Sequence, residues 1–154
     1  MKRTIGIAVT AFGLAAGSLL IATPAQASAA CDSAYRAATS GHVYAYNLPN
    51  CSGLLGHTAG DDADWGDGAG PFTGSDTNNA ESVLNKGIED GYSTVRFSNY
   101  TAYDTANGYG CLKRGELYAD TLWDNKMSNG SPAANSISSH KWVATSYGCA
   151  SIFR

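Results

Sequence analysis

Two short segments of the 154-residue sequence carry similar polar side chains at the same spacing. The first, TNNAESVLNK, runs from Thr77 to Lys86, and the second, AANSISSHKW, runs from Ala133 to Trp142. Their oxygen-bearing side chains fit two roles. They can satisfy loose backbone groups where a chain turns between sheets, or they can ligate a hard cation such as calcium, which takes about 6 to 8 oxygens. The matching positions are Asn78, Ala80 and Ser82 in the first segment and Asn135, Ile137 and Ser139 in the second.

Sequence patterns that support catalysis are missing. The chain contains no Gly-x-Ser-x-Gly elbow and no His-Glu-x-x-His zinc helix. Its three histidines are His42, His57 and His140, and the last follows Ser138 and Ser139 directly. This arrangement favours a structural side chain at the start of a strand. We expect the protein not to be an enzyme.

The acidic stretch from Gly60 to Gly74 is the other candidate for cation binding. Its Asp residues lack the EF-hand spacing, because Gly66 stands where a third ligand is needed and no Glu closes the loop. We therefore predict a solvated surface loop. Trp65 within it has two possible roles, an exposed carbohydrate platform or part of a small β core.

The N-terminus has the character of a secretory signal peptide. A cationic start with Lys2 and Arg3 precedes the nearly apolar run from Ile5 to Ile21. The Ala-x-Ala ending at Ala27 matches signal-peptidase sites. A transmembrane anchor is the alternative, since about 17 apolar residues approach the lower limit for spanning. Pro24 and the cleavage pattern favour a signal peptide over residues 1–27.

The predicted mature chain, residues 28–154, is acidic and has the size of one domain. Without Lys2 and Arg3 it has 8 basic and 13 acidic residues, a net charge of about −5. Phosphate binding needs clustered Lys and Arg, so nucleic acid is not an expected partner. We expect a secreted, extracellular monomer with no membrane anchor after cleavage.

All four cysteines lie in the mature part. An even number in an exported chain predicts two disulfides, although four cysteines allow three pairings. We predict that Cys31 pairs with Cys51 and Cys111 with Cys149, so that each bridge closes a loop within its own half. Metal binding by these cysteines is disfavoured, because no Cys-x-x-Cys or clustered Cys/His spacing occurs.

Strand patterns dominate the mature chain. Residues 41–47 are β-prone, and residues 94–98 alternate apolar with polar side chains. Shorter strands are expected near 111–112, 117–118, 122–123 and 142–143. Each half, about 31–92 and 93–154, then offers a Val-initiated strand, a loop, and the Asn/Ser segment. Two such units paired face to face predict an all-β fold, a disulfide-stapled sandwich of two Greek keys.

At these motifs the chain resembles βγ-crystallin-type domains. It is most similar to the exported actinobacterial peptidase-inhibitor family that includes the metalloproteinase inhibitors. The resemblance covers most of residues 41–143. It rests on five motifs: Val43 to Tyr46 with Asn50 and Gly53, Asn78 to Asn85, Val95 to Phe97, Cys111-Leu112-x-x-Gly115, and Asn135 to Trp142.

The resemblance to βγ-crystallins implies a calcium site built from a pattern of two Asn/Asp residues, any two residues, Ser/Thr and Ser. Here Thr77 and Ala134 stand at the first position, and Glu81 replaces the fifth residue of the first copy. Because of these departures, the resemblance implies only weak calcium binding. No other cofactor is expected. The implied ligands are Asn78, Asn79, Glu81, Asn135, Ser136 and Ser138.

The resemblance to the peptidase inhibitors implies a secreted protease as the partner, with metalloproteinases as the implied class. Such an inhibitor works by holding a rigid loop across the protease cleft. We place this loop beside the second disulfide, at Leu112 and Lys113, because an apolar Leu112 suits a hydrophobic protease pocket. The alternative for Leu112 is a core strand position. Two other functions remain open, a calcium-binding structural module and a small secreted antimicrobial toxin of the killer type.

Overall fold

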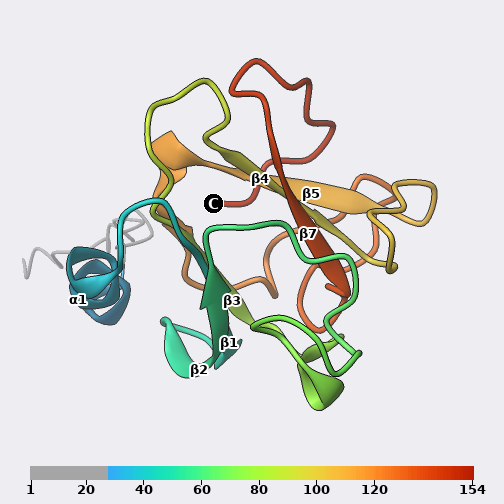
Figure 1. The fold of residues 1–154 in the computed structure, drawn as a ribbon, viewed down its shortest axis with the longest axis horizontal. Helices are drawn as coiled ribbons and strands as arrows, with labels where there is room; N and C mark the ends of the chain where they lie inside the picture. Colours follow the sequence, from blue (N-terminus) through green and yellow to red (C-terminus); the bar gives the residue numbers. More distant parts are fainter. Residues whose placement is uncertain (1–27) are drawn as a thin grey trace, which may run out of the picture.

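The computed structural model describes residues 28–154 (Figure 1). The predicted signal peptide, residues 1–27, lies outside the described residues. No helix within the described part is long and apolar enough to cross a membrane. The elements are helix α1 (Ala29–Ala37), strands β1 (Val43–Leu48), β2 (Ser52–Thr58), β3 (Ser82–Asn85), β4 (Thr94–Ser98), β5 (Tyr109–Lys113), β6 (Tyr118–Ala119) and β7 (Ser139–Val143), and short 3₁₀ turns at Gly74–Asp76 and Arg114–Glu116.

The strands form two antiparallel sheets that exchange strands between the halves of the chain. One sheet has the order β2-β1-β3-β6 and the other the order β5-β4-β7. Strand β6 belongs to the second half but pairs with β3 of the first. In return, Asp62 of the first half forms a β-bridge with His140 in β7. The predicted all-β sandwich of two Greek keys is thereby confirmed.

The main core lies between the two sheets. Val43 and Ala45 of β1 face it, while the alternating Tyr44 and Tyr46 face the other side of the sheet. Most of the stretch from Gly60 to Gly74 is exposed, as the sequence predicted. Its two aromatic residues, however, are fully buried in the core. These residues are Trp65 and Phe72, whose rings stack with centroids 4.1 Å apart.

Helix α1 covers the outer face of the first sheet, and the sequence analysis did not predict it. Ser28 caps its N-terminus by accepting a hydrogen bond from the Cys31 N–H. The helix packs on a second apolar cluster that includes Tyr44, Tyr46 and Tyr118. A nine-residue helix is too short to be stable alone, so this packing and the disulfide of Cys31 hold it in place.

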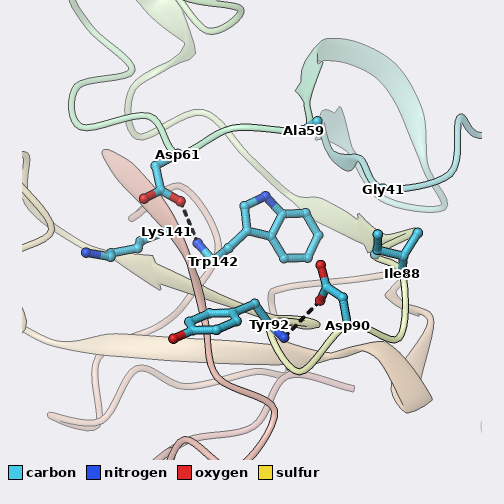
Figure 2. A pocket seen from close by; sticks show the side chains of 9 residues that line it. Gly41, Ala59, Asp61, Ile88, Asp90, Tyr92, Lys141 and Trp142 are labelled. Atoms are coloured by element: carbon cyan, nitrogen blue, oxygen red, sulfur yellow. Dashed lines mark hydrogen bonds between the residues drawn. The ribbon is translucent and has the colours of Figure 1, made fainter.

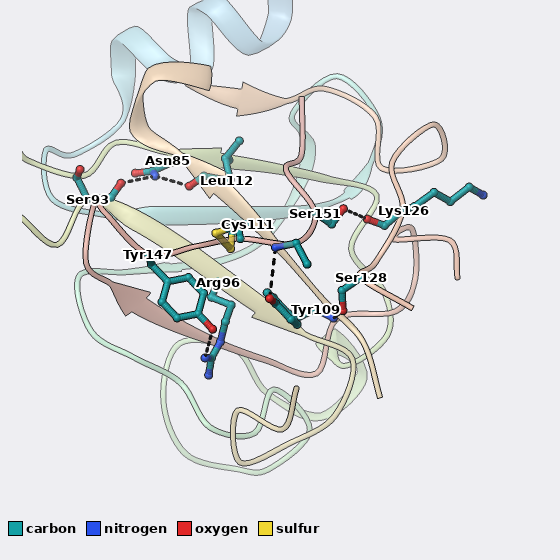
Figure 3. Close-up of a disulfide and its surroundings, with 12 residues drawn as sticks. Asn85, Ser93, Arg96, Tyr109, Cys111, Leu112, Lys126, Ser128, Tyr147 and Ser151 are labelled. Atoms are coloured by element: carbon teal, nitrogen blue, oxygen red, sulfur yellow. Dashed lines mark hydrogen bonds between the residues drawn. A yellow bond between two sulfur atoms is a disulfide. The ribbon is translucent and has the colours of Figure 1, made fainter. Parts of the chain in front are cut away.

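The structure joins Cys31 to Cys51 and Cys111 to Cys149, the pairs proposed from the sequence. The first bridge ties α1 to the β1–β2 turn. The second ties β5 to the C-terminal segment after β7 (Figure 3). Each bridge therefore lies within one half of the chain.

Candidate functional site

The two Asn/Ser segments occupy equivalent positions at the junction between the repeats. The Asn78 N–H donates to the Ile137 carbonyl at 2.7 Å, and the Asn135 N–H donates to the Ala80 carbonyl at 2.8 Å. Both Asn residues adopt left-handed backbone angles, with φ of 53° and 54°. Asn tolerates this conformation better than most residues. The segments are therefore one structural unit used twice, and their backbones bind each other across the junction.

A first polar cluster forms where Asn78 of one repeat meets Ser138 of the other. The Ser138 hydroxyl donates to Asn78 Oδ1 at 3.1 Å and accepts from the Thr77 hydroxyl at 2.9 Å. A surface hollow of about 440 Å³ opens here, and Asp64 also lines it. The cluster offers one carboxylate among neutral oxygens, a donor set that suits weak calcium binding.

The symmetry-related cluster joins Asn135 to Glu81. Asn135 Nδ2 donates to Glu81 Oε1 at 3.2 Å, while Asn135 Oδ1 is buried with no hydrogen-bond partner in the described structure. A buried amide oxygen without a partner is costly, and a bound cation would satisfy it. The donor set here also fits calcium, with a single carboxylate.

The other two implied calcium ligands are not drawn into these side-chain pairs. The Ser136 hydroxyl donates to the nearby Ala134 carbonyl at 3.2 Å. Asn79 donates its backbone N–H to the Asp76 carbonyl, within its own turn. Among residues 28–154, no group of three or more His, Cys, Asp or Glu side chains could hold a metal together. Any calcium site at the junction thus relies on neutral oxygens.

The structure corrects the placement of the inhibitory segment at Leu112 and Lys113. Leu112 is 0% exposed and belongs to the core between the sheets. It lies in β5 opposite Val95, on the inward face of the strand, and so cannot contact a protease. Lys113 is exposed, but it is the last residue of the same strand. The alternative role of Leu112, a core strand residue, is the one observed.

A different exposed segment has the features of a rigid presenting loop. The braced loop, residues 87–93, connects β3 to β4 and so links the two repeats. Its five central residues, Ile88 to Tyr92, are all exposed, while Gly87 and Ser93 at its ends are buried. Ile88 is 51% exposed, which is unusual for a large apolar side chain held in an ordered loop.

The buried Asn85 side chain ties the two ends of the braced loop together. Its Oδ1 accepts from the Gly87 N–H at 2.8 Å, and its Nδ2 donates to the Ser93 carbonyl at 2.9 Å. The same Nδ2 donates to the Leu112 carbonyl at 2.9 Å (Figure 3). One amide therefore fixes both loop ends to strand β5.

Neighbouring segments hold the middle of the braced loop. The Arg114 guanidinium donates to the Gly87 carbonyl at 2.8 Å and to Glu89 at 2.6 Å. The Thr145 N–H donates to the Gly91 carbonyl at 2.7 Å. These contacts come from two separate parts of the chain, the segment after β5 and the segment after β7. Because they are made without any partner present, the loop conformation does not need to be ordered on binding.

A groove of about 520 Å³ runs beside the braced loop (Figure 2). Ile88, Tyr92 and the half-buried Trp142 give it an apolar wall, and charged side chains stand at its rim. The Trp142 N–H donates to Asp61 Oδ1 at 2.8 Å, which fixes β7 against this rim. A partner that docks on Ile88 would therefore also cover this groove.

Sequence reasoning missed the braced loop. The available signal was an apolar residue inside a Gly-bounded acidic segment, GIEDG from Gly87 to Gly91. That pattern indicates a turn but not which contacts brace it. The bracing residues Arg114 and Thr145 lie far away in the sequence, so only the fold brings them together.

His140 is a structural side chain. It is 0% exposed. The Trp65 indole N–H donates to its Nδ1 at 2.9 Å, and its Nε2–H then donates to the Gly60 carbonyl at 3.0 Å. These contacts define the neutral tautomer. Burial lowers the pKa of His140 to about 4, although the Gly60 carbonyl opposes this shift.

Comparison with known proteins identifies two solved structures to which the chain is similar. One, described with the evolution of the eye lens βγ-crystallin domain fold, is 17% identical with a TM-score of 0.48, and the match covers 70% of this chain and 89% of that one. The other, a βγ-crystallin from an archaeon, is 20% identical with a TM-score of 0.46, and the match covers 68% of this chain and 100% of that one.

No protein-family model and no curated protein sequence matches the chain. The predicted peptidase-inhibitor family finds no support among these comparisons and stays a hypothesis. The strand order and pairing of the described residues form two Greek keys that exchange strands.

Proposed function

We propose that this protein is a secreted proteinase inhibitor that presents the braced loop, residues 87–93, to a protease cleft. The observation that carries the proposal is the exposed Ile88 at the start of a loop held by Asn85, Arg114 and Thr145. A loop ordered before binding loses little conformational entropy when it docks. Such a loop binds tightly with few contacts.

A metalloproteinase is the target class that suits Ile88 best. An apolar side chain fits a hydrophobic specificity pocket, as we argued from the sequence for Leu112, and Ile88 is accessible where Leu112 is not. Ile88 is about half exposed, so burying its exposed part contributes roughly 0.8 to 1.5 kcal/mol. The loop is acidic at Glu89 and Asp90, so a protease cleft with a basic rim would add electrostatic steering.

Replacing Ile88 with serine is expected to weaken inhibition by roughly 4- to 12-fold, because the apolar contact with the protease is lost. The measurement is the inhibition constant of the oxidised protein against a thermolysin-like metalloenzyme, with a subtilisin-like serine enzyme in parallel. The fold should be unaffected, since Ile88 already faces solvent in the free protein.

Leu54→Ser is the matched control for Ile88→Ser. Leu54 is 54% exposed but lies in β2, away from the braced loop. The Leu54→Ser variant should have the same inhibition constant as the unmodified protein. Equal inhibition by both variants would exclude the braced loop as the reactive segment. If the unmodified protein inhibits neither enzyme, the inhibitor proposal itself loses its basis.

The second candidate function is a calcium-stabilised structural module. The buried, unpartnered Asn135 Oδ1 beside Glu81 specifically favours it. The residues that would hold calcium are Asn135 and Glu81 in one cluster and Asp64, Asn78 and Ser138 in the other. A bound ion would contribute charge that links the two repeats. The third function, a small secreted antimicrobial toxin, stays a prediction.

Adding about 10 mM calcium is expected to raise the free energy of unfolding by about 1 to 3 kcal/mol, given the weak affinity of low-charge extracellular sites. Thermal unfolding with calcium, and again after chelation, measures this. Glu81→Gln should reduce the gain, whereas Glu116→Gln, outside both clusters, should retain it. A melting temperature that does not respond to calcium would contradict the calcium hypothesis.

A further inference from the structure

Two imidazole rings face each other on the outer side of the first sheet. His42 immediately precedes β1, and His57 lies in β2 directly opposite Tyr44. The Nδ1 atoms of the two histidines are 2.9 Å apart. His57 is exposed and His42 is half-buried, so the space next to both nitrogens is open to solvent.

The surrounding strands hold this pair in place before any ligand binds. The β1–β2 ladder fixes the two backbones relative to each other. The His57 ring stacks on the Tyr44 ring, with centroids 4.6 Å apart and planes 13° apart. The Tyr44 hydroxyl is itself anchored, since it accepts the Thr39 N–H at 2.8 Å. A metal would therefore meet two donors that are already close together.

At least one Nδ1 of the pair is always free of hydrogen when both rings are neutral, because a single proton lies between two nitrogens 2.9 Å apart. Burial, and second the nearby His57, lower the pKa of His42. Cysteines do not compete either, since all four form disulfides.

The two nitrogens lie close enough together to bind one metal ion. Imidazole nitrogens bind at about 2.0 to 2.1 Å, so two of them 2.9 Å apart would subtend about 90° at a shared ion. That is the angle between neighbouring ligands in tetragonal Cu²⁺ and Ni²⁺ sites. Tetrahedral Zn²⁺ would need the nitrogens about 3.3 Å apart. Copper also stands highest in the general affinity order of divalent ions.

We propose that His42 and His57 form a two-histidine transition-metal site that prefers Cu²⁺ to Zn²⁺. Water or small exogenous ligands occupy the remaining positions, because no third His, Cys, Asp or Glu side chain joins a cluster here within the described residues. Sharing one ion requires the hydrogen bond between the two Nδ1 atoms to break and the exposed His57 ring to turn from its stack on Tyr44. The site is independent of the braced loop and of the calcium clusters.

The test is calorimetric titration of the oxidised protein with Cu²⁺ and with Zn²⁺, together with electron paramagnetic resonance of the copper complex. We expect one equivalent of Cu²⁺, bound more tightly than Zn²⁺, with a spectrum that shows two imidazole nitrogens. His42→Gln and His57→Gln should each lower copper affinity by roughly 100-fold, the gain that a second ligand held nearby provides.

His140→Gln is the matched control, because His140 is fully buried and both of its ring nitrogens are already engaged. It should bind copper like the unmodified protein, provided that circular dichroism shows it folded. Copper affinity that survives the loss of either His42 or His57 would overturn the proposal. Binding of Zn²⁺ as tight as that of Cu²⁺ would overturn the geometric preference.

Discussion

Replacing Asn85 with alanine is expected to lower the free energy of unfolding by about 3 to 5 kcal/mol. The substitution removes one amide but leaves three buried backbone groups without it, the Gly87 N–H and the carbonyls of Ser93 and Leu112. Each unsatisfied buried group costs about 1 to 3 kcal/mol, and water can recover part of this. Denaturant unfolding at neutral pH measures the change.

Loosening of the braced loop should accompany this loss of stability. Amide hydrogen exchange in residues 87–93 is expected to accelerate more than exchange in β1, because both loop ends lose their shared anchor. Under the inhibitor proposal, binding to the protease should weaken even in conditions where the variant is folded, since the loop must then be ordered on docking.

Asn129→Ala provides a matched comparison for burial. Asn129 also makes three side-chain hydrogen bonds, one to the Asn107 carbonyl and two with Ser131, but it is exposed. Water can replace these partners, so we expect a loss below about 1 kcal/mol. Equal destabilisation by the two substitutions would show that burial of Asn85 is not what makes it important.

Acidification is expected to destabilise the protein by about 3 kcal/mol through His140 alone. In the unfolded chain this histidine has a pKa of 6.5, and in the native state burial lowers its pKa to about 4. Between these values the unfolded state binds more protons than the native state, so stability falls as the pH falls. The contribution is fully present above about pH 6.5 and fully lost below about pH 4. A shift of 2.5 units corresponds to about 3 kcal/mol.

Urea unfolding at a series of pH values between 7 and 4 tests this expectation. His140→Gln keeps a neutral side chain that can donate and accept, so it should be less stable at pH 7 but show a flatter acid slope. If His140→Gln does not fold, nuclear magnetic resonance of the ring nitrogens of His140 in the unmodified protein measures the pH at which this side chain is protonated. Protonation of His140 in the folded protein near pH 6.5 would contradict the prediction.

The sequence predicted those strands in which the alternation of apolar and polar side chains matches their burial in the sheet. Residues 94–98 alternate apolar and polar side chains and form β4 with those bounds. The recurrence of the Asn/Ser segments also corresponds to a structural repeat, as the reciprocal hydrogen bonds of Asn78 and Asn135 show. These signals are local or internal to the sequence, and the fold does not override them.

Features that depend on long-range contacts could not be predicted. Strand β2, SGLLGHT, lies outside the strands expected from the sequence, and pairing with β1 makes it a strand. Trp65 lies in an acidic, Gly-rich stretch, and its entry into the core depends on contacts with Phe72 and His140 that the local sequence does not show. The sequence analysis placed Leu112 in an exposed inhibitory loop because it lies next to a disulfide cysteine. In the structure it pairs with Val95, and its side chain lies in the core between the sheets.

The exchange of strands between the repeats has a consequence for proteolysis. The braced loop is the covalent link between the halves, so hydrolysis of the Gly87–Ile88 bond would divide the chain there. Strand β6 would still pair with β3, and Asp62 with His140, so the two fragments would stay assembled. Neither disulfide crosses the cut, and the fragments would separate only on denaturation. A protease that cuts this loop would therefore release no fragment. The cleaved protein would keep its fold, and its two new chain ends would stay close enough for the peptide bond to form again.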